Sequence, residues 1–243
     1  MSGARLDLEG IGKSFRGLRA VHDVSFTVPA GAVHALIGPN GAGKTTIFNM
    51  IAGVFAPDAG AVRLDGETIS GLRPDRICDA GVGRTFQLVK PFRGLSVLEN
   101  VTVGALHRHR HLGQARDSAA AILSRLGLHD RRHQLAESLT LPDRKRLEVA
   151  RALATEPKLL LLDEVMAGLR PTEVDVMVQF LRELNQRTGL TILLIEHVMR
   201  AVMALAAEIV VVSYGEKIAQ GTPHEVTRHQ AVLDVYLGEQ EMA

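Results

Sequence analysis

The sequence predicts an α/β fold in which a helical insertion interrupts a mainly parallel sheet, and three observations lead to this prediction. Short apolar runs alternate with helical stretches, an order typical of strands that are buried on both faces of a parallel sheet. A glycine-rich loop joins the first apolar run to a helix. From about residue 95 to residue 156, β-branched runs become rare and helical periodicity takes over, which marks the expected insertion.

The first 90 residues predict several strands around one helix. Alternating patterns at 5–15 and 21–28 indicate two strands. The apolar run 32–38 leads through the glycine-rich loop into a helix expected at 46–55. Asp65 and Gly66 form a hairpin-type turn signal between two short strands.

Helices dominate the insertion, and strands return after Pro157. Helical periodicity is clear at 117–128 and 144–153. The later apolar runs predict strands at 159–164, 191–197 and 208–213. The final residues, 232–243, predict a short helix.

The bulk composition is that of a globular chain. It has 243 residues, of which 46% are hydrophobic and 23% are charged, far from the signature of disorder. The formal net charge of +1 does not indicate a nucleic-acid partner. The single cysteine, Cys78, excludes an internal disulfide and favours a reducing compartment. A polar start and short apolar runs predict neither a signal peptide nor a membrane helix, so we expect a soluble cytoplasmic chain.

The segment GPNGAGKT fits the pattern G-x-x-x-x-G-K-[ST] and lies between a strand and a helix, the context that this motif requires. Its glycines let the backbone N–H groups surround phosphates, and Lys44 adds a positive charge. Thr45 offers a hydroxyl to Mg²⁺. A glycine-rich turn without a ligand is the alternative interpretation. The predicted nucleotide-binding residues here are Gly38, Pro39, Asn40, Gly41, Ala42, Gly43, Lys44, Thr45 and Thr46.

Two acids follow the four leucines of LLLLDE. We expect Asp163 to be a second ligand of Mg²⁺ and Glu164 to activate the water that attacks the terminal phosphate. A strand that simply ends in two acids is the alternative. With the glycine-rich loop upstream, the pair predicts ATP hydrolysis.

With these motifs, the whole chain resembles the ATPases of ATP-binding cassette (ABC) transporters. The resemblance implies a P-loop NTPase (RecA-like) core with an antiparallel β subdomain and a helical ABC subdomain. It implies one domain over residues 1–243, with the core at about 1–90 and 157–243 and the helical subdomain at about 91–156. ATP and Mg²⁺ are the implied cofactors, and the cytoplasmic side of the inner or plasma membrane is the implied location.

The same resemblance assigns three further residues. Phe15 matches the aromatic residue that stacks on adenine, although a core phenylalanine is an equal alternative from the sequence. Gln87 matches the glutamine that contacts the metal and links it to the helical subdomain. His197 matches the histidine that contacts the γ-phosphate, whereas a lone histidine after a strand is usually structural.

The family's signature, Leu-Ser-Gly-Gly-Gln, is presented to the ATP held by the other cassette of a dimer. Here its place is taken by Leu139, Thr140, Leu141, Pro142 and Asp143. Thr140 is expected to cap the following helix in a capping box with Asp143. Pro142 has no N–H to donate, and Asp143 places negative charge toward phosphate. We therefore expect weaker nucleotide sandwiching, with about 1.5–3 kcal/mol lost for a missing charge-assisted donor. Arg170 lies in the loop that follows Glu164, at a position where the family usually has Asp or Asn. In the family this loop couples the two cassettes of the dimer, and the arginine puts that role in doubt here.

Two stretches, 84–106 and 215–239, resemble the ATPases of branched-chain amino acid importers. The resemblance implies a hetero- or homodimer of cassettes beneath two membrane permeases, fed by a periplasmic binding protein, with no nucleic acid. The transported molecule is left open, because related importers carry other amides and acids. A lipid or lipopolysaccharide exporter ATPase and a regulator without turnover are the alternatives.

The run His107–His111 alternates histidine with arginine. Arginine charge opposes a metal cation and no adjacent carboxylate or cysteine completes a ligand set, so a solvated loop is expected.

Overall fold

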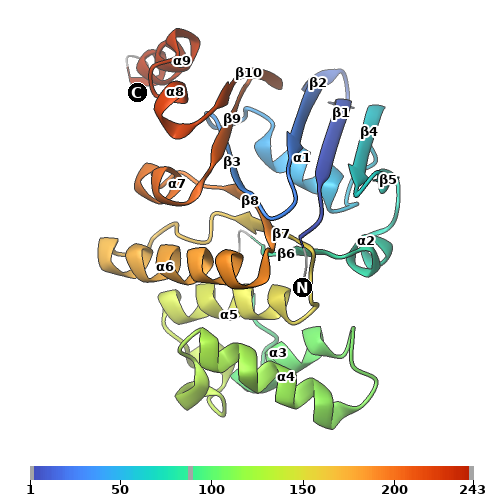
Figure 1. The fold of residues 1–243 in the computed structure, drawn as a ribbon, viewed down its shortest axis with the longest axis vertical. Helices are drawn as coiled ribbons and strands as arrows, with labels where there is room; N and C mark the ends of the chain where they lie inside the picture. Colours follow the sequence, from blue (N-terminus) through green and yellow to red (C-terminus); the bar gives the residue numbers. More distant parts are fainter. Residues whose placement is uncertain (1–2, 87–89, 241–243) are drawn as a thin grey trace.

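The computed structural model describes residues 3–86 and 90–240, and its strands form two sheets. The first sheet has the order β2-β1-β4-β5 and is antiparallel; the second has the order β10-β9-β3-β8-β7-β6. Strands β3, β6, β7, β8 and β9 pair in parallel, and β10 pairs antiparallel to β9. The predicted α/β class with a mainly parallel sheet is confirmed. Figure 1 shows helices α3, α4 and α5 together at the end of the molecule away from the antiparallel sheet.

The strands lie close to their predicted places. Their bounds are Leu6–Phe15 (β1), Leu18–Val28 (β2), Val33–Ile37 (β3), Ala59–Leu64 (β4), Glu67–Thr68 (β5), Val82–Arg84 (β6), Leu159–Asp163 (β7), Thr191–Ile195 (β8), Glu208–Ser213 (β9) and Glu216–Gly221 (β10). The predicted hairpin turn is confirmed, because Asp65 and Gly66 have φ of 50° and 84°, and tight hairpins favour two left-handed residues.

The main helices fill the remaining segments. Their bounds are Lys44–Ile51 (α1), Pro74–Ala80 (α2), Val97–Ala105 (α3), Leu112–Arg125 (α4), Leu141–Leu153 (α5), Pro171–Thr188 (α6), Met199–Leu205 (α7), Pro223–Val226 (α8) and Gln230–Gln240 (α9), with 3-10 turns at His129–Arg131 (η1) and Ala136–Ser138 (η2). In the described part of the chain, no helix combines the length and the apolar character needed to span a bilayer.

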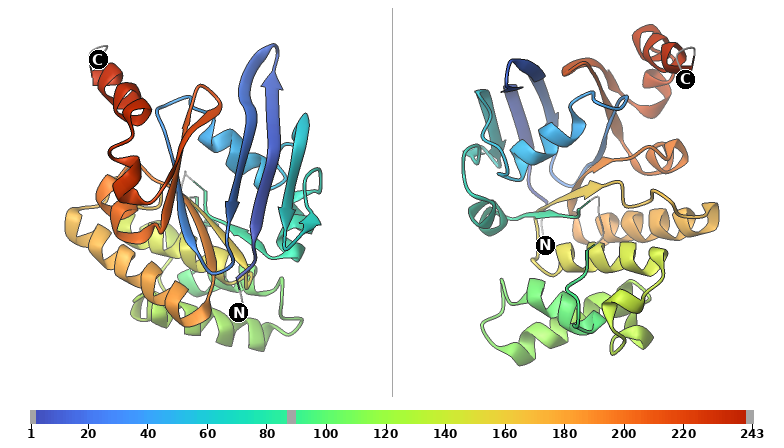
Figure 2. Two further views of the ribbon diagram at one scale, coloured as in Figure 1. Left: turned by 45° about the horizontal axis from the view of Figure 1, so that its top comes forward. Right: turned by 180° about the vertical axis from the view of Figure 1, so that it is seen from behind.

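Two hydrophobic cores lie on opposite faces of the six-stranded sheet, because its inner strands are buried on both sides. In β7, Leu160 and Leu162 face the helical core, whereas Leu159 and Leu161 face the core that contains α1. Helix α1 contributes Ile47, Phe48, Met50 and Ile51 to this second core, which also contains the inner face of the antiparallel sheet. Helix α1 is therefore held between the two sheets, as the two views of Figure 2 also show.

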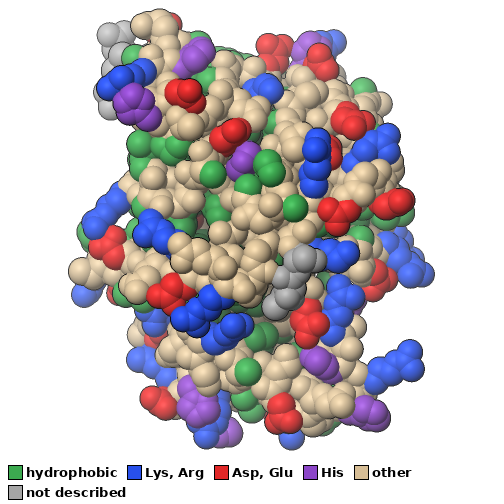
Figure 3. All heavy atoms as spheres, in the orientation of Figure 1, with side chains coloured by type: hydrophobic (Ala, Val, Ile, Leu, Met, Phe, Trp, Pro, Cys, Tyr) green, Lys and Arg blue, Asp and Glu red, His purple; other side chains and the backbone are tan. Residues whose placement is uncertain are grey.

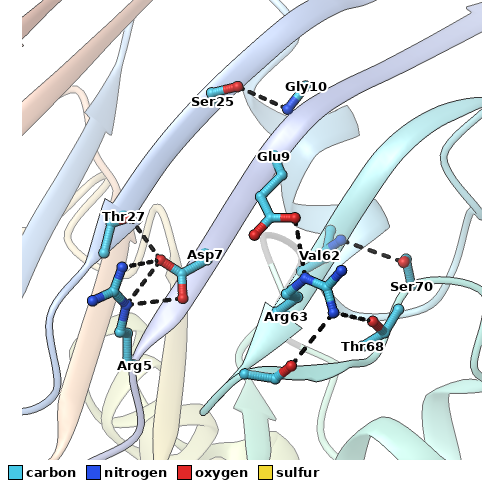
Figure 4. A network of polar contacts seen from close by, with 11 residues as sticks. Arg5, Asp7, Glu9, Gly10, Ser25, Thr27, Val62, Arg63, Thr68 and Ser70 are labelled. Carbon is cyan, nitrogen blue, oxygen red and sulfur yellow. Dashed lines mark hydrogen bonds and ion pairs between the residues drawn. The ribbon is translucent and has the colours of Figure 1, made fainter.

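The outer face of the antiparallel sheet carries cross-strand polar pairs (Figure 4). Asp7 of β1 accepts hydrogen bonds from Arg5 at 2.8 Å and from Thr27 of β2 at 2.7 Å. Arg63 of β4 donates to Glu9 at 3.0 Å and to Thr68 at 2.7 Å. The alternate residues Leu6, Leu8, Val62 and Leu64 are buried beneath them. The alternation of apolar and polar residues thus fixes which face covers α1.

Candidate active site

The glycine-rich loop leaves β3 and enters α1, and its backbone requires glycine at two positions. Gly38 has φ of 153°, and a Cβ there would lie 2.0 Å from the carbonyl oxygen of Val212 on β9. Gly43 has φ of 101°, and a Cβ there would lie 2.6 Å from the carbonyl oxygen of Ala20. Side chains at these two positions would therefore collide with backbone, so the loop keeps its path only with glycine.

Lys44, the first residue of α1, points back into this loop. Its side chain is buried, with 6% exposed, and Nζ donates to the carbonyl oxygens of Gly38 at 2.6 Å and Pro39 at 2.7 Å. The ammonium group is thus held at the centre of the loop where the helix presents its positive end. A charge in this position can exchange carbonyl contacts for phosphate oxygens without moving the backbone.

Thr45 and Asp163 line one cavity of about 460 Å³ at the end of β7. Asp163 is 2% exposed, and its Oδ2 accepts a hydrogen bond from Arg84 at 3.1 Å. Its Oδ1 has no hydrogen-bond partner among the described residues. Burial raises the pKa of the Asp163 carboxyl, and the hydrogen bond from Arg84 acts against that rise. A hydroxyl and a carboxylate oxygen that still lacks a partner fit the preference of Mg²⁺ for hard oxygen ligands.

Glu164 follows Asp163 and its side chain meets His197. Oε1 of Glu164 lies 3.1 Å from Nε2 of His197, which follows β8. Glu164 has φ of 50°, a left-handed conformation that is uncommon outside glycine. Its N–H donates to the carbonyl oxygen of Ile195 at 2.9 Å. The structure therefore brings the predicted water-activating acid and the predicted γ-phosphate histidine together at the end of the parallel strands.

Two buried ionisable residues next to this pair escaped the sequence analysis. Lys145 of α5 is 6% exposed, and its Nζ donates to the carbonyl oxygen of Glu164 at 2.7 Å. Glu196 is 2% exposed, and its Oε1 accepts a hydrogen bond from the N–H of Met166 at 2.8 Å. A signal was present: Glu196 directly extends an apolar strand, and Lys145 lies on the same buried helix face as Glu148 and Val149.

Burial raises the pKa of Glu196 to about 7, while the Met166 N–H and the charge of Lys145 act in the opposite direction. The folded protein therefore holds this proton more tightly than the unfolded chain, in which the pKa is about 4.5. This proton stabilises the folded protein fully at pH values below the pKa of Glu196 in the unfolded chain. The stabilisation is lost as the pH rises through the pKa of Glu196 in the folded protein.

We expect Glu196→Gln to gain stability over the wild type as the pH rises, because the amide has no proton to lose. Between about pH 5 and about pH 8, the difference in unfolding free energy should shift by about 2–3 kcal/mol in favour of the variant. Urea denaturation of both proteins at the two pH values measures this shift. All other titrating groups are common to the two proteins, so a difference that stays constant with pH would contradict the prediction.

Phe15 ends β1 and is not a core residue. Its side chain is 37% exposed, so the core alternative is wrong. The ring packs edge-on against Phe55 with centroids 5.2 Å apart, and Nζ of Lys13 lies 5.8 Å from its centroid. An exposed ring of this kind can stack on a planar ligand. Gln87, which is predicted to contact the metal, lies outside the described residues.

The segment Leu139–Asp143 lies at the start of α5, which packs on the opposite face of the six-stranded sheet from α1 (Figures 1 and 2). Thr140 is the N-cap of α5, but the predicted capping box is wrong in detail, because its side chain accepts no hydrogen bond from the helix backbone. Its hydroxyl instead donates to Oδ2 of Asp143 at 2.8 Å. Leu141 is 44% exposed and lies beside Gly168, where a Cβ would come within 3.3 Å of its Cδ2.

The carboxylate of Asp143 was expected to place its negative charge toward phosphate, but it does not point into solvent. Asp143 is only 6% exposed and forms an ion pair with Arg131 of η1. Arg146, one turn further along α5, lies 3.5 Å from its Oδ1. Two cations therefore offset the carboxylate, and the predicted repulsion of phosphate by Asp143 loses its physical basis. The other predicted cause of weaker nucleotide sandwiching, the missing N–H of Pro142, is unaffected by these contacts.

The histidine–arginine run forms an exposed loop between α3 and α4 that contacts neighbouring elements. His107 lies 3.4 Å from Asp79 of α2, and His109 lies 3.3 Å from Glu156. Arg108 donates to the carbonyl oxygen of Thr155 at 2.9 Å. Across residues 3–86 and 90–240, no group of three or more His, Cys, Asp or Glu side chains is placed to hold a metal.

Two family models match the sequence. The ABC transporter model matches residues 21–167. A model described as branched-chain amino acid ATP-binding cassette transporter matches residues 216–241, which contain β10, α8 and α9.

Three curated relatives cover almost the whole chain. The high-affinity branched-chain amino acid transport ATP-binding protein LivG of Salmonella typhimurium is 39% identical, with 98% of this chain and 100% of the relative covered. BraF of Pseudomonas aeruginosa, which has the same description, is 38% identical over the same shares. The lipopolysaccharide export system ATP-binding protein LptB of Escherichia coli is 37% identical, with 97% and 98% covered.

Solved structures resemble the fold over its full length. An ATP-binding cassette of an ABC transporter in its ADP conformation superposes with a TM-score of 0.88 and 30% identity, covering 97% of this chain and 99% of that one. A nucleotide-free ATP-binding cassette from an ABC transporter gives the same TM-score and identity, with 96% and 98% covered.

Proposed function

This chain belongs to the ABC transporter ATPases, and we propose that it hydrolyses Mg-ATP to power an importer of branched-chain amino acids or related small amides and acids. The observation that carries the hydrolytic part is the contact between the side chains of Glu164 and His197, which lie 3.1 Å apart. Glu164 directly follows the buried Asp163 in the sequence. The importer part is supported by the family match over residues 216–241 and by the names of the relatives.

The proposed mechanism assigns a task to each element around the cavity. The loop 38–46 binds the triphosphate, and Phe15 stacks on the adenine. Lys44 turns from the Gly38 and Pro39 carbonyl oxygens to the outer phosphates. Thr45 and Asp163, with Gln87, would hold Mg²⁺, which when bound neutralises charge that develops on the phosphate oxygens.

The remaining step is the activation of water. Glu164 takes a proton from the water that attacks the γ-phosphorus, while His197 donates a hydrogen bond to a γ-phosphate oxygen. The 3.1 Å contact between the two side chains orients the carboxylate before the nucleotide arrives. A positioned base of this kind contributes about 10²–10⁴ to the rate.

The proposed partners are a second cassette, identical or related, two membrane permeases and, indirectly, a periplasmic binding protein. An apolar cavity of about 280 Å³ lies between the core and the helices α3 and α5. The exposed rings of Phe86 and Phe92 line it, which suits a helical segment of a permease. We propose, with these partners, that the chain is a peripheral subunit at the cytoplasmic face of the membrane.

No nucleic-acid partner is proposed. Lys and Arg side chains are interspersed with Asp and Glu on the face shown in Figure 3, and the net charge is +1. Binding to a phosphate backbone needs a concentrated positive surface.

Uptake measurements test the importer part. Cells that lack this chain should lose high-affinity uptake of labelled leucine, and the wild-type gene should restore it. Glu164→Gln, expressed to the same level, should not restore uptake. Unchanged leucine uptake in the deletion strain, together with copurification of exporter permeases, would favour lipid or lipopolysaccharide export, the activity named for LptB.

A regulator without turnover is the remaining alternative. The presence of Lys44, Asp163, Glu164 and His197 argues against it, because each would supply a different part of the hydrolytic reaction. ATP binding without any hydrolysis by the complete transporter complex would support this alternative.

A further inference from the structure

We propose that Lys145 is a positioning residue for ATP hydrolysis, acting through its hydrogen bond to the backbone of Glu164. The inference rests on the hydrolytic function proposed above. It assigns a task to a buried lysine outside the nucleotide loop, on the helix that begins with the segment Leu139–Asp143.

The first support is the contact with the peptide of Glu164. Nζ of Lys145 donates to this carbonyl oxygen at 2.7 Å, and the N–H of Ala167 donates to the same oxygen at 3.3 Å. Glu164 adopts φ of 50°, a conformation that costs free energy in a non-glycine residue and persists only where neighbours enforce it. Since the same backbone angles aim the carboxylate at His197, a donor that holds this peptide also holds the base in place.

The second support is the charge environment of the ammonium group. Carboxylates act electrostatically on Lys145 from three elements, its own helix included: Asp163 and Glu164 at the end of β7, Glu196 after β8, and Glu148 on α5. Glu196 in turn accepts the N–H of Met166 and directly precedes His197. Lys145 therefore offsets acids on both segments that carry the reacting side chains, while it is almost completely shielded from water.

The third support is the place of Lys145 on α5. It lies four residues after Leu141, on a continuous helix of 13 residues that begins at Thr140 as its cap. In the proposed dimer, the start of this helix faces the nucleotide of the other cassette. A shift of the helix start would thus act directly on the peptide of Glu164 through a 2.7 Å hydrogen bond. This contact gives the two nucleotide sites of a dimer a short physical connection within one chain.

A simpler role would be charge compensation for Glu196 alone. The two roles differ in what a second substitution does. If Lys145 only neutralises Glu196, replacing Glu196 by glutamine removes the need for the lysine and restores the rate. If Lys145 positions Glu164, the hydrolytic defect persists in the absence of the Glu196 charge.

The experiment uses the full-length chain in the complex with the membrane subunits that copurify with it. Lys145→Met, Lys145→Arg, the double variant Lys145→Met with Glu196→Gln, and the exposed control Lys217→Met on β10 are compared with the wild type. Steady-state hydrolysis gives kcat and KM, a fluorescent ATP analogue gives nucleotide affinity, and thermal unfolding reports folding.

We expect Lys145→Met and the double variant to lower kcat by about 10- to 100-fold, with KM and nucleotide affinity within about 2-fold of the wild type. Lys145→Arg should recover most of the rate, because it keeps both donor and charge. Lys217→Met should behave as the wild type.

Three results would overturn the proposal. These are a wild-type kcat in the double variant, a defect confined to KM, or failure of both Lys145→Met proteins to fold, which would make the lysine purely structural. Absence of hydrolysis by the wild-type complex would instead refute the proposed function itself.

Discussion

Replacing Glu164 by glutamine is expected to stop turnover and leave ATP bound. Glutamine keeps the size of the side chain but cannot accept a proton from water, so hydrolysis should slow by about 10²–10⁴-fold. The loop 38–46 and Lys44 are untouched by the substitution, so nucleotide affinity should be retained or increased. Hydrolysis of radiolabelled ATP by the purified transporter complex, together with the amount of ATP still bound after gel filtration, measures both quantities.

Glu183→Gln on the exposed face of α6 is a matched control for this substitution, because it makes the same chemical change away from the cavity. It should hydrolyse ATP at the wild-type rate. Turnover of Glu164→Gln within a few-fold of the wild type would remove Glu164 from the role of base. The contact with His197 would then have to be explained as structural.

Replacing Lys44 by methionine is expected to weaken nucleotide binding strongly. The ammonium group is buried at the centre of the loop, and a lost charge-assisted contact costs about 1.5–3 kcal/mol, which is about 10- to 150-fold in affinity. Hydrolysis should fall at least as far, because the same charge is needed when the γ-phosphate is transferred. Fluorescent ATP titration measures the affinity, with Glu164→Gln as the reference that binds but does not hydrolyse.

Thermal unfolding of the same variant, without nucleotide, separates a local effect from misfolding. The lysine also donates to Gly38 and Pro39, so a small loss of stability is expected in addition to the loss of affinity. A Lys44→Met protein that binds ATP as the wild type does would contradict the assignment of the loop as the triphosphate site.

Local sequence signals predicted the elements that depend on local chemistry. The leucine run of β7, the turn at Asp65 and the loop before α1 were all recognisable, because apolar burial, left-handed turns and close backbone approach each restrict the residues allowed. Element ends were less certain: the helix expected at 46–55 is observed at Lys44–Ile51, because Gly53 ends it in a left-handed turn.

The contacts that the sequence did not reveal join residues that are distant in the chain. Asp143 was expected to point outward, but its partner Arg131 lies on another turn, twelve residues away. Lys145 and Glu164 are 19 residues apart, and Met166 and Glu196 are 30 apart. Such pairs depend on how α5, β7 and β8 pack, and no periodic pattern encodes that packing.

The position of α1 between the two sheets determines how a ligand meets the loop in front of it. Its apolar side chains are fixed from both sides, so the backbone donors of the loop are already oriented when the chain has folded. An incoming triphosphate would therefore lose little free energy to ordering of the protein, and its contacts would translate almost directly into affinity. Conformational changes during turnover would accordingly occur in parts of the chain other than this pre-ordered loop.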